Sequence, residues 1–256
     1  MNSKTKEKAL SVIMPVAFGL LLLLLLQTQV IHRIFSLKTM QLPLPSTIFE
    51  ALCTKAPKII SDAGVTLSAV SAGLLLGSFI GFLVASFATM LPGVGYGSLT
   101  IMTALNSIPV LALAPLMNRW FSTSMGAKMA VVTVVCMGAM AANAYRGLNN
   151  LKPFSLDLMK SYAANRRQIF FKLRLPNCVP YLFTGLKINV ATAMIGAIIS
   201  EFFATETSGI GYMIKNSLKV GNQKILGWAY IITAAIISML IYALILFLER
   251  LAARRY

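Results

Sequence analysis

Charged residues are scarce in this sequence, and acidic residues are the scarcest. Only 12% of its 256 residues are charged, and only 7 are Asp or Glu. Because a soluble globular domain carries roughly 25% charged residues, this chain lacks the polar side chains to cover a water-facing surface. A soluble enzyme, a disordered tail and a secreted disulfide scaffold are therefore excluded. With 57% hydrophobic residues and a mean hydropathy of +0.77, the composition predicts an all-α polytopic membrane protein.

Metal-ligating residues and enzyme motifs are also lacking. The three cysteines, Cys53, Cys136 and Cys178, lie far apart, and His32 is the only histidine. Zinc, haem and iron–sulfur sites need clustered His or Cys ligands, so no metal site and no catalytic residue are expected. The sequence contains no G-x-x-x-x-G-K-[ST] loop, so we expect this chain to bind neither ATP nor any other cofactor.

Apolar runs of about 20 residues, the helix length that crosses about 30 Å of hydrocarbon, are abundant instead. Six of them cover about 11–31, 63–90, 99–121, 128–145, 181–204 and 227–248. The first follows Lys4, Lys6 and Lys8, as a signal-peptide core would, but it is longer and has no A-x-A cleavage site. We therefore interpret it as a retained membrane anchor.

The 23 basic residues lie mainly between these runs, and the densest group falls within 146–180. Because Lys and Arg are enriched in cytoplasmic loops, this loop and both termini are predicted to be cytoplasmic. No basic segment carries the interleaved aromatics of a single-strand-binding groove, so no nucleic-acid partner is expected. The predicted organisation is a cytoplasmic N-terminus (1–10), a six-helix transmembrane domain (11–249) and a cytoplasmic C-terminus (250–256).

Small residues recur at every fourth position of the second run, at Ala69, Gly73, Gly77, Gly81 and Ala85. This spacing puts them on one helix face, where the backbone of another helix can approach closely. We interpret the three glycines as helix-packing residues rather than as substrate contacts.

The third run is interrupted by Pro109 and Pro115, each of which lacks a backbone N–H. Such an interruption is tolerated where it lines a cavity, although a kinked packing helix has the same pattern. Glu201, the only acid inside a predicted run, lies near its outer end and has either a functional role or a structural or solvated one. The candidate translocation-pathway residues are Asn106, Ser107, Pro109, Pro115, Asn118, Asn143, Asn189 and Glu201.

Two short amphipathic helices are predicted in the basic cytoplasmic loop. Leu156, Met159, Tyr162 and Ala163 recur at helical spacing, as do Ile169, Phe170 and Leu173 in the second run. Asn165 lies between the two runs and can cap the second helix. Their apolar faces must be buried either on lipid headgroups or in a groove of a partner protein.

This loop resembles the cytoplasmic signature of the permease subunits of binding-protein-dependent ABC importers, E-A-A-x3-G-x9-I-x-L-P. Asp157 falls on the Glu, Leu158 and Met159 on the alanines, Ala163 on the glycine and Leu173 on the isoleucine, while Leu175 and Pro176 match outright. Because Ala163 replaces the glycine, we expect Ala164 and Asn165 to supply the turn, since Asn tolerates a left-handed conformation.

The resemblance extends from about Gln41 to Glu249. It is carried by 42–46, 66–67, 108–116, 120–121, 180–186, 200–201 and 209–212. These segments together are similar to the branch that transports sulfonates, taurine, nitrate, bicarbonate and vitamin-related pyrimidines or flavins.

The resemblance implies a non-catalytic permease of the bacterial inner membrane with the type I importer fold. Its implied partners are a second permease copy, two cytoplasmic ATPase subunits that hold ATP and Mg²⁺, an extracytoplasmic binding protein and the lipid bilayer. The outer charges that would meet the binding protein are Lys215, Lys219, Lys224, Glu50, Asp62 and Glu206. The implied ATPase-coupling residues are Asp157, Leu158, Met159, Tyr162, Ala163, Asn165, Arg166, Ile169, Leu173, Leu175 and Pro176.

The expected substrate is a small planar heterocycle. No Lys or Arg lies near the middle of a predicted run, whereas neutral amides lie among methionines there. Such groups suit a thiamine-pyrimidine precursor or riboflavin better than an anion. The alternative is a sulfonate, taurine, nitrate or bicarbonate. A more distant alternative is an ion-coupled secondary transporter, which would need more intramembrane acids than this sequence offers. A membrane scaffold is a third alternative, and it would show no flux of any substrate across the membrane.

Overall fold

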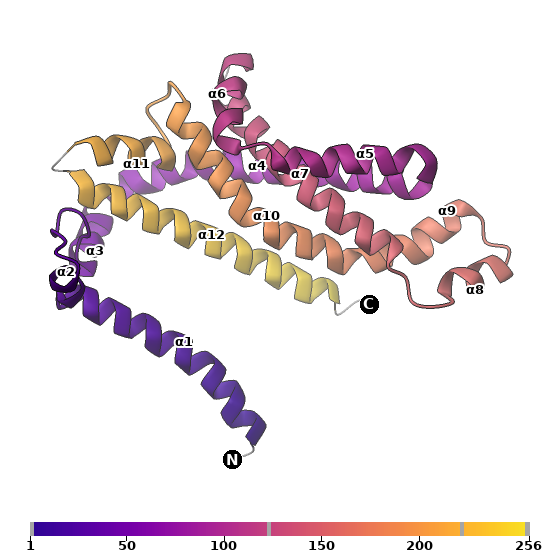
Figure 1. The fold of residues 1–256 in the computed structure, drawn as a ribbon, viewed down its shortest axis with the longest axis horizontal. Helices are drawn as coiled ribbons and strands as arrows, with labels where there is room; N and C mark the ends of the chain where they lie inside the picture. Colours follow the sequence, from indigo (N-terminus) through magenta and orange to yellow (C-terminus); the bar gives the residue numbers. More distant parts are fainter. Residues whose placement is uncertain (1–2, 122–123, 221–222, 254–256) are drawn as a thin grey trace. The chain divides into compact units, whose positions relative to one another are not determined.

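A computed structural model describes residues 3–121, 124–220 and 223–253. Within these ranges the chain forms helices and no strand, which confirms the all-α prediction (Figure 1). The predicted C-terminal tail beyond Ala253 lies outside the described residues. The helices are α1 Ser3–Gln27, α2 Val30–Ile34, α3 Pro45–Thr54, α4 Ala56–Met90, α5 Pro92–Ala104, α6 Val110–Trp120, α7 Ser124–Asn149, α8 Ser155–Ser161, α9 Arg166–Ile169, α10 Leu175–Phe203, α11 Ile210–Lys219 and α12 Lys224–Ala253.

Two tight turns join neighbouring helices in this series. A 3₁₀ turn, Leu105–Ser107, follows α5, and a π-helical turn, Phe170–Arg174, connects α9 to α10 without a break. Helix α9, the π-helical turn and α10 therefore form one continuous helix from Arg166 to Phe203.

Long apolar helices account for the last five predicted runs. Among the described residues, α4, α7, Arg166–Phe203 and α12 are each long and apolar enough to cross a membrane. Helices α5 and α6 meet at an angle of 101° and make a fifth span if the bent pair crosses as one unit. The first run differs from the prediction of one span over 11–31, because α1 ends at Gln27 and Gln29 has a left-handed φ of 58°.

The described chain divides into two compact units. One unit contains the chain up to Ile59 together with Ile214–Ile232, and the other contains Ile60–Met213 and the chain from Thr233 onward. In the first unit, Gln27 at the end of α1 binds Ser46 at the start of α3 through its side-chain amide. The second unit holds the loop 146–180, which the sequence predicts to be cytoplasmic, and the candidate pathway residues.

Helices α4, α7 and α10 form the core of the second unit. Val70 and Leu74 of α4 pack against Val132 of α7 and against Ala193 and Met194 of α10. Large side chains such as Leu75 and Phe79 are exposed on the outside of the same helices. This distribution is typical of a membrane protein, in which small residues mediate helix contacts and large apolar residues face lipid.

The three glycines of α4 lie where its backbone approaches α7. A Cβ atom added at Gly73 would lie 2.5 Å from the Cβ of Val132, and one at Gly77 would lie 2.5 Å from the carbonyl oxygen of Thr133. A Cβ atom at Gly81 would collide with the carbonyl oxygen of Met137. The two helices can therefore pack this closely only because α4 carries no side chains along this face.

We expect Gly77→Leu to destabilise the bundle by about 1–3 kcal/mol, the usual cost of overpacking, because α7 leaves no room for a side chain. Gly64→Leu on the same helix is the matched control, since a Cβ atom at Gly64 meets nothing within 4 Å. Thermal unfolding in detergent measures the effect. Equal loss of stability in both variants would contradict the packing role.

Candidate functional site

The loop 146–180 forms a helix pair, α8 and α9, beyond the end of α7 (Figure 1). Helix α8 ends in a Schellman motif, in which Ala163 N–H donates to the Lys160 carbonyl at 2.9 Å and Ala164 N–H to the Met159 carbonyl at 3.0 Å. Ala163 adopts the required left-handed conformation with φ 53°. The prediction that Ala164 and Asn165 supply this turn is wrong, because the backbone hydrogen bonds fix the left-handed residue at Ala163.

Asn165 instead has an extended conformation and caps the second helix. Its side chain accepts a hydrogen bond from Gln168 N–H, and the Gln168 side chain accepts one from Asn165 N–H, both at 2.8 Å. This reciprocal pair is a capping box, with Gln168 at the N3 position. The second predicted amphipathic helix is therefore the first turns of the long helix that continues into α10, and Leu173, Leu175 and Pro176 lie inside that helix.

Polar contacts attach this helix to the end of α7. Arg174 Nη1 donates to the Leu148 carbonyl at 3.0 Å and to Asn149 Oδ1 at 2.6 Å. Asn177 Nδ2 donates to the Gly147 carbonyl at 2.7 Å. Because these bonds join the start of α10 to the last turns of α7, displacement of the loop would move both helices together.

An uncovered apolar face runs along α8. Phe154, Leu158 and Tyr162 are spaced by four residues and are 83%, 57% and 77% exposed. Leu158 and the C-cap residue Tyr162 are about one turn apart and lie on one side of α8, and Phe154 precedes the helix as its N-cap residue. Ile169, which the sequence analysis grouped with the coupling residues, is only half exposed and is followed by the buried Phe170. The stripe formed by Phe154, Leu158 and Tyr162 is called the α8 apolar stripe below.

We expect Ala163→Gly to stabilise the loop by about 1 kcal/mol, because glycine adopts a positive φ without the steric cost of a Cβ atom. Ala164→Gly is the matched control: Ala164 does not have a positive φ, so glycine there should be neutral or destabilising. Hydrogen exchange of the α8 amides measures the local effect. Greater protection in Ala164→Gly than in Ala163→Gly would refute this account of the turn.

A partly open cavity of about 420 Å³ lies between the bend of α5 and α6 and the helices α7 and α10. The break lies at Pro109, which precedes the first residue of α6, whereas Pro115 lies inside a continuous helix. Asn106 lines the cavity from the 3₁₀ turn, and Thr192 lines it from α10. The remaining lining residues are apolar: Leu105, Ile108, Val110, Val135, Ala139 and Ile195. A neutral ligand with one or two hydrogen-bonding groups fits this lining.

The other candidate pathway amides bind backbone carbonyls of the bundle. Asn118 donates to the Ser200 carbonyl, Asn143 to the Ala139 carbonyl one turn earlier, and Asn189 to the Cys136 carbonyl. Asn189 is completely buried, while Ser107 and Pro109 are exposed at the bend. The structure thus places Asn106 at the bend cavity, and it adds Thr192, which the sequence analysis did not single out.

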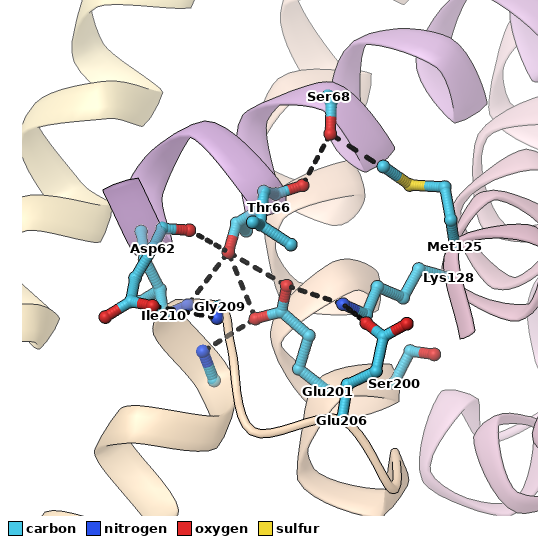
Figure 2. Close-up of polar contacts among 12 residues, drawn as sticks. Asp62, Thr66, Ser68, Met125, Lys128, Ser200, Glu201, Glu206, Gly209 and Ile210 are labelled. Carbon is cyan, nitrogen blue, oxygen red and sulfur yellow. Dashed lines mark hydrogen bonds and ion pairs between the residues drawn. The ribbon is translucent and has the colours of Figure 1, made fainter. Parts of the chain in front are cut away.

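Glu201 lies in a buried polar cluster between α4, α7 and α10 (Figure 2). The Thr66 hydroxyl lies 2.9 and 3.1 Å from its two carboxylate oxygens, and Gly211 N–H donates to Oε2 at 2.7 Å. Lys128 Nζ lies 3.7 Å from Oε1, and neither side chain of this ion pair is exposed. Glu201 is therefore not solvated, and its oxygens are occupied by protein groups.

The loop after α10 closes over this cluster. Lys128 also donates to Glu206 at 3.2 Å, and Gly209 N–H donates to Asp62 Oδ1 at 3.4 Å. Partial burial raises the pKa of Glu206, but the neighbouring Ser124 and Lys128 side chains lower it by more, so its pKa lies below the ordinary value of a glutamate. Glu206 is thus charged at neutral pH and neutralises part of the Lys128 charge.

Sequence reasoning missed most partners of Glu201. Asp62 was assigned to an exposed outer loop, but α4 begins at Ala56 and buries it. Lys128 was read as the end of a span, yet it is fully buried. A signal was available: the predicted orientation puts Lys128 and Glu201 at the outer ends of neighbouring runs, and charges buried at the same depth are expected to pair.

We expect Lys128→Met to destabilise the protein by about 3–5 kcal/mol, because it leaves the buried Glu201 carboxylate without its cation. Lys187→Met is the matched control, since Lys187 pairs with Glu249 at 2.8 Å where both side chains remain partly exposed. Loss of this partly exposed ion pair should lower the free energy of unfolding by less. Denaturant unfolding in detergent compares the two, and Lys128→Met with Glu201→Gln should recover part of the loss. A cost for Lys128→Met no larger than for Lys187→Met would be incompatible with a buried charge pair.

Among the residues that the structure describes, no group of three His, Cys, Asp or Glu side chains could hold a metal ion.

Sequence comparison relates this chain to known transport proteins. A probable ABC transporter permease of Haemophilus influenzae is 31% identical over 67% of this chain and 70% of that protein. The formylaminopyrimidine transport permease ThiX of Halalkalibacterium halodurans is 31% identical over 60% of this chain and 61% of its own length. The taurine transport permease TauC of Escherichia coli is 27% identical over 69% of this chain and 66% of its own length.

Solved structures show the same fold. A chain of the inward-facing MetNI methionine ABC transporter superposes with a TM-score of 0.65 at 18% identity, covering 73% of this chain and 93% of that one. A chain of an amino acid ABC transporter gives a TM-score of 0.63 at 15% identity, covering 81% and 98%. Residues 73–256 also match the family described as the binding-protein-dependent transport system inner membrane component. The chain therefore belongs to this family of ABC importer permeases.

Proposed function

We propose that this permease couples to a separate cytoplasmic ATPase through the α8 apolar stripe. The proposal rests on one observation: three large apolar side chains lie exposed around α8, in a loop rich in basic residues. Burial of each such side chain contributes about 1.5–3 kcal/mol, so a complementary groove on a partner is strongly favoured. An ATPase of this kind would act from the cytoplasm, so we also propose that this loop and both chain ends lie in the cytoplasm of a bacterial cell.

The attachment of the loop to α7 supports a mechanical role. Arg174 and Asn177 bind the last turns of α7, so a force on α8 and α9 reaches the transmembrane bundle directly. The capping box at Asn165 and the Schellman motif at Ala163 fix the angle between α8 and α9. A rigid helix pair of this kind can transmit movements of an ATPase to the spans. ATP hydrolysis itself would occur on the partner.

We expect Leu158→Asp with Tyr162→Asp to reduce substrate-stimulated ATPase activity of the assembled transporter at least about tenfold, because a carboxylate cannot be buried in an apolar groove. ATPase assays in proteoliposomes with the partner subunits measure the effect. Both side chains are exposed, so the double variant should insert and fold normally.

Two further variants serve as controls for this experiment. Lys172→Glu adds a negative charge at an exposed position of the same loop but outside α8, and it should retain activity. Tyr162→Phe keeps the apolar ring and should also be active. Wild-type stimulation in the Leu158→Asp, Tyr162→Asp variant would rule out coupling through this stripe.

The transporter is further proposed to contain two permease copies, two ATPase subunits and an extracytoplasmic binding protein. Each copy would contribute one bend cavity to the pathway. Glu206 remains partly exposed although it binds Lys128, so we propose it as one of the outer charges that meet the binding protein.

For the substrate, we propose a planar, uncharged heterocycle such as a thiamine-pyrimidine precursor or riboflavin. The bend cavity supports this choice because its lining offers an amide and a hydroxyl but no charged side chain. The name of ThiX points to a pyrimidine, whereas that of TauC points to a sulfonate. Sulfonates, taurine, nitrate and bicarbonate are therefore the second candidates.

Ligand binding by the partner binding protein tests the substrate class. Thermal-shift measurements with formylaminopyrimidine, riboflavin, taurine, an alkanesulfonate, nitrate and bicarbonate should show stabilisation by one of the first two compounds. Stabilisation by an anion alone would overturn the heterocycle proposal and leave the coupling role unaffected.

A further inference from the structure

A second cavity, of about 250 Å³, lies between the end of α4, helix α8 and the start of the long helix at Arg166. Its apolar side is formed by Met90, Leu156 and Phe170. Its basic side chains are Lys160, Arg166 and Arg174, and its lining includes no acidic residue. Three cations thus surround a cavity that is smaller than the roughly 300–1,000 Å³ of pockets for drug-sized ligands.

The positive charge of this cavity is poorly compensated within the chain. Arg174 is bound by the Leu148 carbonyl and the Asn149 side-chain oxygen, which are both neutral. Lys160 has only Asp157 at 3.9 Å, and that pair is largely exposed. Among the described residues, no carboxylate forms an ion pair with Arg166 or Arg174. An anion in the cavity would relieve the repulsion between these cations.

This cavity lies on a different face of α8 from the apolar stripe. Leu156 and Lys160 are one turn apart and line the cavity, whereas Leu158 lies two residues from each of them. Two residues correspond to about 200° around a helix, so the stripe and the cavity face nearly opposite directions. Docking of the stripe on an ATPase would leave the cavity facing Thr89 and Met90 at the end of α4.

The position of the cavity indicates which anion it takes. Met90 ends a helix that is long and apolar enough to cross the bilayer, so a cavity beside its last turn can meet the lipid headgroups. Guanidinium groups match phosphate oxygens with two parallel hydrogen bonds, and basic pockets on the cytoplasmic side of spans bind anionic headgroups. The apolar side formed by Met90, Leu156 and Phe170 suits the glycerol and upper acyl groups.

We propose that this cavity binds a phosphate group, supplied by the headgroup of an anionic phospholipid. Bound there, the lipid would hold α8 and the start of the long helix against the end of α4. The inference rests on the cytoplasmic placement of the loop and goes beyond its coupling role.

Binding is tested on the full-length permease in neutral detergent, with no ATPase present. The probes are dioleoylphosphatidylglycerol, dioleoylphosphatidylcholine and inorganic phosphate, followed by native mass spectrometry and thermal unfolding. Wild-type protein should retain phosphatidylglycerol in preference to phosphatidylcholine and unfold several degrees higher with it. Lys160→Ala with Arg166→Ala should weaken this binding at least about tenfold.

The matched control also removes two positive charges, but from residues that do not line the cavity. Arg167→Ala with Lys172→Ala changes two exposed basic residues of the same segment that do not line the cavity, and it should bind phosphatidylglycerol as the wild type does. Stabilisation by inorganic phosphate at the same site would make free phosphate the ligand and uphold the site. Equal loss in both double variants, or no preference for phosphatidylglycerol, would overturn the proposal. Since no ATPase is used, failure here is distinguishable from failure of coupling.

Discussion

The close approach of α4 to α7 is the constraint on which the rest of the second unit depends. Inside a bilayer, apolar side chains gain little by leaving lipid for protein, so helices associate through close packing and buried polar contacts. The glycines at 73, 77 and 81 allow the close packing, because α7 occupies the space of their missing side chains. The buried polar contacts come from Glu201 of α10, which binds Thr66 of α4 and Lys128 of α7. Close packing therefore joins α4 to α7, and the polar cluster joins both helices to α10.

Helix α7 connects the places where the chain can act. Its N-terminal end carries Lys128, its middle contributes Val135 and Ala139 to the bend cavity, and its last turn accepts hydrogen bonds from Arg174 and Asn177. A displacement of the loop 146–180 thus reaches the cavity through one continuous helix. Tightly packed helices move as rigid bodies rather than bending locally, which makes such a connection mechanically efficient.

The sequence predicted those features that depend on composition and spacing. Apolar runs located five of the spans, and the small-residue spacing located the face of α4 that contacts α7. It failed where the outcome depends on backbone hydrogen bonds or on distant partners. The left-handed residue is Ala163 rather than Asn165, because the Schellman bonds to Met159 and Lys160 outweigh the intrinsic preference for Asn. Pairing of Lys128 with Glu201 required the packing of α7 against α10, which no local pattern encodes.

The shortage of acids explains how charge is distributed over the structure. Glu201 and Glu206 both bind Lys128, and Glu249 binds Lys187, so these three acids are paired with lysines of the second unit. A carboxylate beside a buried or half-buried lysine offsets part of the cost of removing that lysine from water. Few acids remain for the loop 146–180, where Asp157 is the only acidic residue and lies 3.9 Å from Lys160. The positive charge of this loop is therefore largely uncompensated by its own acids, so an anion bound from outside the chain would stabilise the loop.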